Sequence, residues 1–134
     1  MQNLLNITMI LAGVIFFSGN ALASKNLISH QQPEAFDNVK VVKLASNKHA
    51  SDFLIYIKKH VPAHYHESHT EIVYIIEGTA TMQLDEQEIK MKKGDYIRIL
   101  PGQVHAVEVT SKMPLKVLSV QTPEFDGSDR VMVN

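Results

Sequence analysis

The chain has 134 residues, and its 13 Lys and Arg against 14 Asp and Glu give a net charge of -1. This balance excludes a global field that would attract nucleic acid or an anionic membrane, so a small molecule or another protein is the expected partner. Apolar residues make up 45% of the chain, enough for one buried core. Cysteine is absent, so any metal site must use nitrogen and oxygen ligands.

The first 23 residues resemble a targeting segment. They carry no charged side chain, and an apolar stretch from Ile7 to Phe17 is followed by the small-residue pattern Ala21-Leu22-Ala23. The Lys or Arg that usually precedes such a stretch is missing, but the stretch is well short of the ~20 residues that span a bilayer. We therefore expect residues 1–23 to be a cleaved signal peptide. The mature protein would be periplasmic or secreted, with no stable membrane anchor.

The rest of the chain alternates between short strand patterns and turns. Residues 24–36 are polar and aperiodic, which indicates an arm. Gly78 allows a bend, and Asp85-Glu86-Gln87 and Lys93-Gly94-Asp95 are typical of turns. About eight strands and no convincing amphipathic helix predict an all-β antiparallel sandwich or barrel. The expected strands span residues 39–44, 53–57, 72–76, 79–84, 89–92, 96–100, 104–109 and 115–120.

A cluster of histidines is the strongest chemical signal. Four of the seven histidines fall between positions 60 and 69. On a strand, His64 and His66 would leave the same face with α-carbons about 6.6 Å apart, so both imidazoles could reach one metal ion. Glu71 lies five residues after His66, so residues 68–70 must form a loop or bulge for its carboxylate to enter the same cavity.

The spacing around these residues resembles the cupin superfamily. His64, His66, Glu71 and Gly78 match its first motif, and the run from Gly94 to His105 is similar to its second. The resemblance implies a single jelly-roll barrel over residues 51–134, preceded by an arm and first strand over residues 24–50. It also implies one divalent metal ion held by His64, His66, Glu71 and His105. The chain departs from the family pattern at three positions that are not ligands: Lys58, Leu100 and Val109.

Three His and one Glu would leave one or two coordination positions open. Iron, manganese, nickel, copper and zinc all suit this ligand set. The expected function is that of an oxygenase-like or lyase-like metal-dependent enzyme acting on a small organic molecule. The alternatives are a non-catalytic module that binds metal or a small ligand, and a sugar isomerase or epimerase. Glu67, His69 and Tyr65 are the nearest candidates for a general acid or base, by proximity in sequence alone.

Other polar groups have simpler interpretations. Arg98 is expected to point into solvent, although it could reach an anionic substrate. Lys90, Lys92 and Lys93 indicate a solvated face rather than a polyanion site. His30, His49 and His60 lie outside the motifs and are expected at the surface. We also expect a homodimer, because such barrels pair through sheet edges and outward apolar faces.

The signal-peptide interpretation predicts a mature chain that begins at or near Ser24. Intact mass of the protein recovered outside the cytoplasm measures this start directly. Recovery of full-length chain alone, embedded in membrane, would contradict the interpretation.

Overall fold

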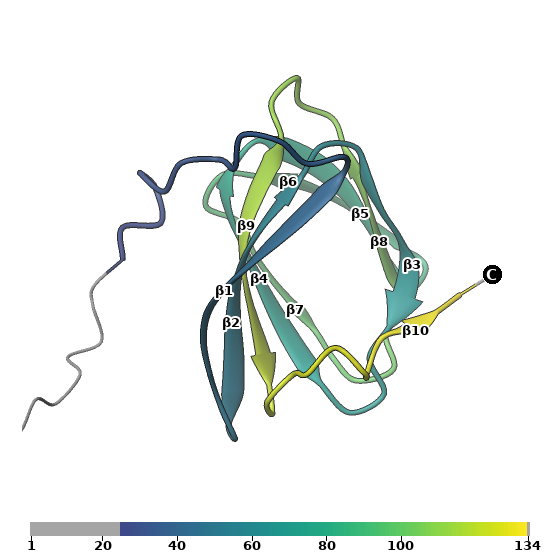
Figure 1. Ribbon diagram of the computed structural model, residues 1–134. Coiled ribbons are helices and arrows are strands. Elements are labelled where there is room, and N and C mark those ends of the chain that lie inside the picture. Colours follow the sequence, from purple (N-terminus) through teal and green to yellow (C-terminus); the bar gives the residue numbers. More distant parts are fainter. Residues whose placement is uncertain (1–24, 134) are drawn as a thin grey trace, which may run out of the picture.

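The computed structural model describes residues 25–133, in which ten strands form two facing antiparallel sheets (Figure 1). The expected signal peptide and Ser24 lie outside the described residues. Among residues 25–133, no helix is long and apolar enough to cross a membrane. The strands are β1 (Val39–Asn47), β2 (Ala50–Ile57), β3 (His60–Tyr65), β4 (Thr70–Glu77), β5 (Thr79–Leu84), β6 (Gln87–Lys92), β7 (Tyr96–Ile99), β8 (His105–Val109), β9 (Leu115–Thr122) and β10 (Val131–Met132).

The strand order is that of a jelly roll. One sheet has the order β1-β2-β9-β4-β7 and the other β10-β3-β8-β5-β6, so the chain crosses repeatedly between the sheets. This confirms the predicted all-β fold. The structure adds β3 and β10 to the eight expected strands. β3 contains Pro62 and few apolar residues, and β10 has only two residues, so neither carries a strong strand signal.

The core lies between the sheets and follows the two-residue period of the strands. In β5 and β7 every second side chain is buried, as the pleat of a strand requires. Burying each large apolar side chain contributes roughly 1.5–3 kcal/mol, which makes this cluster the main source of stability. Its buried members are Ile57, Val73, Ile75, Ala80, Met82, Leu84, Met91, Ile97, Ile99, Val107, Leu115 and Val117.

The N-terminal arm covers the outer face of the first sheet. Phe36 packs against Tyr56 there, with ring centroids 6.4 Å apart. The buried ammonium of Lys116 donates to the carbonyl oxygens of Ile28 (3.0 Å) and His30 (2.8 Å). His30, expected at the surface, is half-buried with Nδ1 2.9 Å from the Tyr56 hydroxyl, whereas His49 and His60 are exposed.

Gly78 joins β4 to β5 where two chain segments approach closely. Its φ is +85°, and a β-carbon there would lie 3.0 Å from the Leu115 α-carbon and 3.0 Å from the Pro114 carbonyl oxygen. A side chain would therefore meet fixed backbone as well as an unfavourable φ. Gly94 also has a positive φ, +91°, but a β-carbon there would meet nothing within 4 Å.

The Gly78→Ala variant is expected to lose about 1–3 kcal/mol more unfolding free energy than Gly94→Ala. Both substitutions carry the cost of a positive φ, so the difference isolates the collision with the backbone at residues 114 and 115. Urea unfolding of the two variants measures it, and equal losses would show that the contact at Gly78 relaxes freely.

Candidate metal centre

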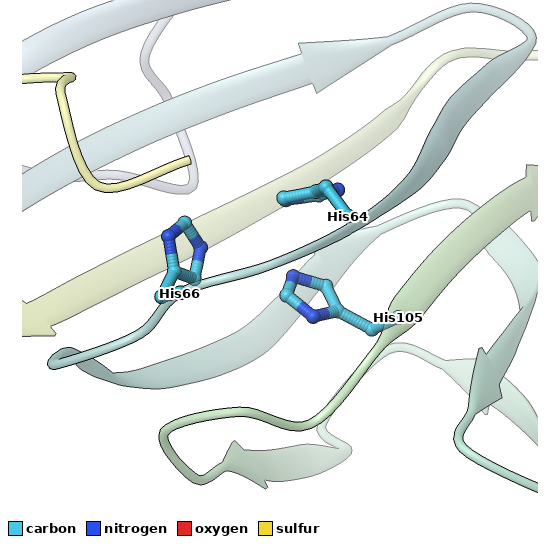
Figure 2. Close-up of side chains that lie close together, drawn as sticks. All are labelled: His64, His66 and His105. Atoms are coloured by element: carbon cyan, nitrogen blue, oxygen red, sulfur yellow. The ribbon is translucent and has the colours of Figure 1, made fainter. Parts of the chain in front are cut away.

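Three buried histidines converge inside the barrel (Figure 2). His64 lies near the end of β3, His66 directly follows that strand, and His105 begins β8. His64 and His105 are register partners across the β3–β8 pair, and their ring centroids lie 4.1 Å apart. One nitrogen from each of the three rings lies within 4.8 Å of the others, so the rings could hold a metal ion.

The same hydrogen-bonding device orients all three rings. In each case Nδ1 donates to a backbone carbonyl oxygen, which can only accept, so Nδ1 carries the hydrogen and Nε2 keeps its lone pair. The acceptors are the carbonyl oxygens of Pro62 for His64 (2.8 Å), Gln103 for His105 (3.1 Å) and Asp129 for His66.

The Nε2 atoms of His66 and His105 are the ones that need a partner. Both are fully buried and form no hydrogen bond within the part of the chain that the structure describes. A buried acceptor without a partner costs on the order of 1–3 kcal/mol. A metal cation would fill this need, and imidazole with an Nδ1 donor bond is the usual form of a metal-bound histidine. The residues present thus fit a divalent transition metal.

Glu71 lies beside two of the rings. Its Oε2 is 3.4 Å from His66 Nε2 and 3.5 Å from His105 Nε2, and the Ser119 hydroxyl donates to Oε1. Burial acts to raise the pKa of Glu71, but His105, His66 and Ser119 outweigh it and hold that pKa well below its usual range. The group is therefore a carboxylate at neutral pH, the form that binds a cation. The four predicted ligands meet at one place, and their assignment as ligands stays a prediction.

The rings of the cluster differ in their affinity for protons. Burial, helped by the neighbouring His105, lowers the pKa of His64 to about 4, so this ring is neutral at pH 7. Burial also acts to lower the pKa of His66, but Glu71 and the carbonyl of Asp129 outweigh it and the pKa is raised. With Glu71 beside it, His66 thus holds a proton more readily than His64 does.

A cavity of about 150 Å³ opens next to the cluster. Most of its wall is apolar side chains from both sheets. Val41 of β1 and Arg130 line it and are exposed, so they mark its mouth. Among the described residues that line the cavity, the ionisable ones are the three histidines, Glu71 and Arg130.

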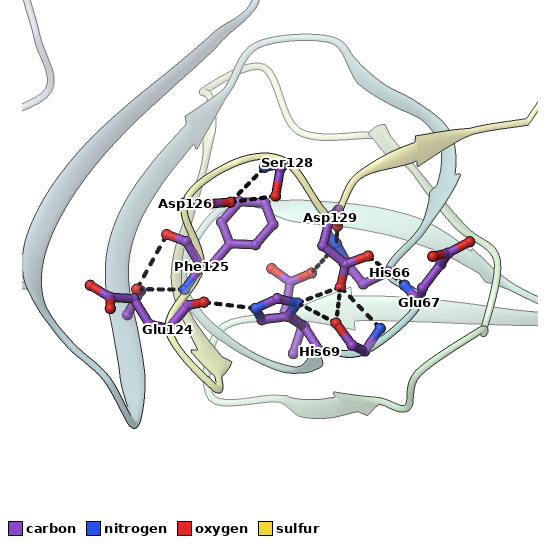
Figure 3. A network of polar contacts seen from close by, with 11 residues as sticks. His66, Glu67, His69, Glu124, Phe125, Asp126, Ser128 and Asp129 are labelled. Carbon is purple, nitrogen blue, oxygen red and sulfur yellow. Dashed lines mark hydrogen bonds and ion pairs between the residues drawn. The ribbon is translucent and has the colours of Figure 1, made fainter.

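A C-terminal segment, residues 123–130, closes the site and was not predicted from the sequence. The Asp129 carboxylate accepts from the backbone N–H groups of Glu67 (2.7 Å) and Ser68 (3.0 Å) and from His69 Nδ1 (Figure 3). Burial would raise the pKa of Asp129, but these donors, His69 foremost, lower it well below its usual range. The carboxylate of Asp129 thus holds the 66–69 loop, and the carbonyl oxygen of the same residue holds the His66 ring.

The three candidate acid–base residues lie away from the cavity. Both His69 ring nitrogens face acceptors, the Asp129 carboxylate and the Glu124 carbonyl oxygen (2.9 Å). The exposed Glu67 points away from this network (Figure 3), and Tyr65 alternates with the inward-facing His64 and is half-buried. None of the three lines the cavity, so the geometry gives no support to their predicted roles. A loop does form between His66 and Glu71, but over residues 66–69 rather than 68–70, because Thr70 already belongs to β4.

The cationic side chains that the sequence places in solvent are exposed in the structure. Arg98 is exposed on β7, in agreement with its expected solvent-facing orientation. Lys90, Lys92 and Lys93 are exposed as well.

The protein is thus a small two-sheet β-barrel with a buried histidine triad that could hold a metal ion. The cupin domain family matches residues 53–121, and the chain belongs to this family. An uncharacterized protein of Aquifex aeolicus is 28% identical over 120 residues, which cover 90% of this chain and 98% of that protein.

Two relatives with described activities are more distant or match over less of their length. Quercetin 2,3-dioxygenase of Bacillus subtilis is 40% identical over 60 residues, which cover 45% of this chain but only 18% of the dioxygenase. Streptomyces Pac13, described as a nucleoside dehydratase, superposes with a TM-score of 0.63 at 12% identity. The superposed region covers 74% of this chain and 82% of the Pac13 chain. The latter similarity concerns the fold alone.

The Asp129→Ala variant is expected to bind zinc about 10–100-fold more weakly than the wild type, because it removes the carboxylate that anchors residue 129 and so loosens the backbone carbonyl to which His66 Nδ1 donates. Competition with a chromogenic chelator measures the dissociation constant. Asp126→Ala is the matched control, since among residues 25–133 the Asp126 carboxylate accepts hydrogen bonds from Ser128 alone. Unchanged zinc affinity in Asp129→Ala would contradict the orienting role.

Proposed function

We propose that the chain holds one divalent transition metal ion through His64, His66, Glu71 and His105 and acts as a metal-dependent enzyme on a small organic molecule. The observation that carries this proposal is the set of three rings fixed through Nδ1, with Nε2 atoms that converge beside a carboxylate. When bound, the ion would supply Lewis acidity and open coordination positions next to the apolar cavity. Its location outside the cytoplasm and its pairing as a homodimer stay predictions from the sequence.

The role of Glu71 separates the two reaction classes that the sequence suggests. A lyase needs a base to remove a proton from substrate carbon, and Glu71 is the one carboxylate among the described cavity residues. If Glu71 is a ligand, the cavity keeps no free base, which favours an oxygenase with dioxygen as co-substrate. The Ser119 bond and the two ring contacts hold the carboxylate against the histidines, so we favour the oxygenase.

The relatives show that this barrel supports more than one activity. One is a dioxygenase and another is described as a dehydratase. A non-catalytic binding module is the second candidate. The positions of Tyr65, Glu67 and His69 outside the cavity favour it, because the described residues that line the cavity include no acid or base other than the candidate ligands.

Single Ala substitutions at His64, His66, His105 and Glu71 are expected to lower zinc affinity at least tenfold, because each removes a ligand from a site of four. Elemental analysis after dialysis and chelator competition give occupancy and affinity. The matched controls are His49→Ala and His60→Ala, whose side chains are exposed.

Equal losses in the controls would contradict the ligand assignment. The cobalt-loaded protein then separates the two candidate functions: a true substrate changes the ligand-field spectrum and is consumed, whereas a ligand of a binding module changes the spectrum and is recovered intact.

A further inference from the structure

Besides the histidines, one polar side chain that lines the cavity has a buried atom with no hydrogen-bond partner among residues 25–133. Gln121 lies on β9 as the register partner of Glu71, so the two side chains share the inner face of the sheet. Gln121 is 5% exposed and lines the cavity, and its Oε1 has no hydrogen bond among the described residues. Because such a group costs on the order of 1–3 kcal/mol, its retention points to a ligand that supplies the missing bond.

A free positive charge stands at the mouth of the same cavity. Arg130 is exposed and lines the cavity, and among residues 25–133 it forms no ion pair with a carboxylate. Arg130 directly follows Asp129 in the chain. The bonds of the Asp129 carboxylate to the 66–69 loop fix the backbone of residues 129 and 130 in place. A guanidinium on an anchored backbone, with no carboxylate partner among residues 25–133, favours an anionic oxygen group.

The size and lining of the cavity restrict the remainder of the ligand. About 150 Å³ is a volume at which apolar cavities in other proteins bind benzene. Most of the wall is Val, Ile, Leu, Met and Phe, and polar side chains interrupt it only at the histidine cluster, Glu71, Gln121 and Arg130. The space thus suits a compact apolar body with one polar end.

We infer that Gln121 and Arg130 select a small carboxylate with an apolar body of about the size of one ring, Arg130 by its charge and Gln121 by its amide. Because the amide oxygen has no partner among the described residues, the amide can turn so that Nε2 donates to a carboxylate oxygen or Oε1 accepts from a hydroxyl. This inference rests on the proposed function, because the ligand would occupy the open side of the same metal centre. Gln121 and Arg130 are positioning residues for that ligand and take no proton from it.

Three probes of equal body and different polar end test the inference: benzoate, benzyl alcohol and toluene. Protein-observed NMR titration of the purified protein, with zinc and without it, gives the dissociation constants. Benzoate is expected to bind about tenfold more tightly than benzyl alcohol, and Arg130→Gln to remove that preference. Gln121→Leu should weaken benzoate and benzyl alcohol alike and leave toluene unchanged.

Two variants outside the cavity serve as matched controls, Arg98→Gln on β7 and Gln87→Leu on β6, both at exposed positions. Thermal unfolding separates a ligand role for Gln121 from a structural one. An amide without a protein partner can be replaced by Leu with no loss of stability, whereas a structural amide cannot. A lowered melting temperature with unchanged probe binding would overturn the role of Gln121.

Equal binding of benzoate and benzyl alcohol, or the same preference in Arg130→Gln as in the wild type, would overturn the inferred ligand class. Titration without zinc keeps this result apart from the metal proposal. If the protein binds no metal but the benzoate preference and its dependence on Arg130 persist, the metal proposal fails and the ligand class stands. If zinc binds as proposed and no carboxylate preference exists, the inferred ligand class fails and the metal proposal stands.

Discussion

The hydrogen bonds from three imidazole Nδ1 atoms to backbone carbonyl oxygens are the constraint on which the centre depends. Each bond fixes the ring's tautomer and turns Nε2 into the barrel, where no other described group satisfies two of the three atoms. Two of the acceptors lie two residues before their histidine, at Pro62 and Gln103, so the local chain path orients those rings. The third acceptor, the carbonyl oxygen of Asp129, comes from a distant segment of the chain. The orientation of the His66 ring therefore depends on how the C-terminal segment is held.

A polar cluster inside an apolar barrel is tolerated here because almost every polar atom in it has a partner. Glu71 contacts two rings and accepts from Ser119, and the ring nitrogens that point outward donate to carbonyl oxygens. The atoms left over are His66 Nε2, His105 Nε2 and Gln121 Oε1, and all three belong to residues that line the cavity. The buried polar atoms that lack a hydrogen bond thus belong to the wall of the cavity, where a ligand would touch them.

The sequence predicted the parts of the fold that depend on local pattern. Alternating strands such as β5 and β7, the bend at Gly78 and the turn after Leu84 all follow from period and turn chemistry, and the spacing of His64, His66, Glu71 and His105 indicated their convergence. The closing segment escaped prediction because its bonds to the 66–69 loop join residues about sixty positions apart, and no spacing rule connects Asp129 to His66. Proximity in sequence was equally misleading for His69, since a loop can turn a side chain away from the site that its neighbours form.

The bond between His66 and Asp129 joins residues 63 positions apart in sequence. The segment from β3 to β4, which crosses from one sheet to the other, therefore carries three of the four candidate ligands, His64, His66 and Glu71, but not the complete means of orienting them. Long-range contacts of this kind form late in folding, because the chain between them must first be organised. An ion bound by His64, His66 and Glu71 alone would therefore lack the bond that orients the His66 ring. If the chain binds metal as proposed, the full ligand set is oriented for the ion only once residue 129 has docked on the 66–69 loop.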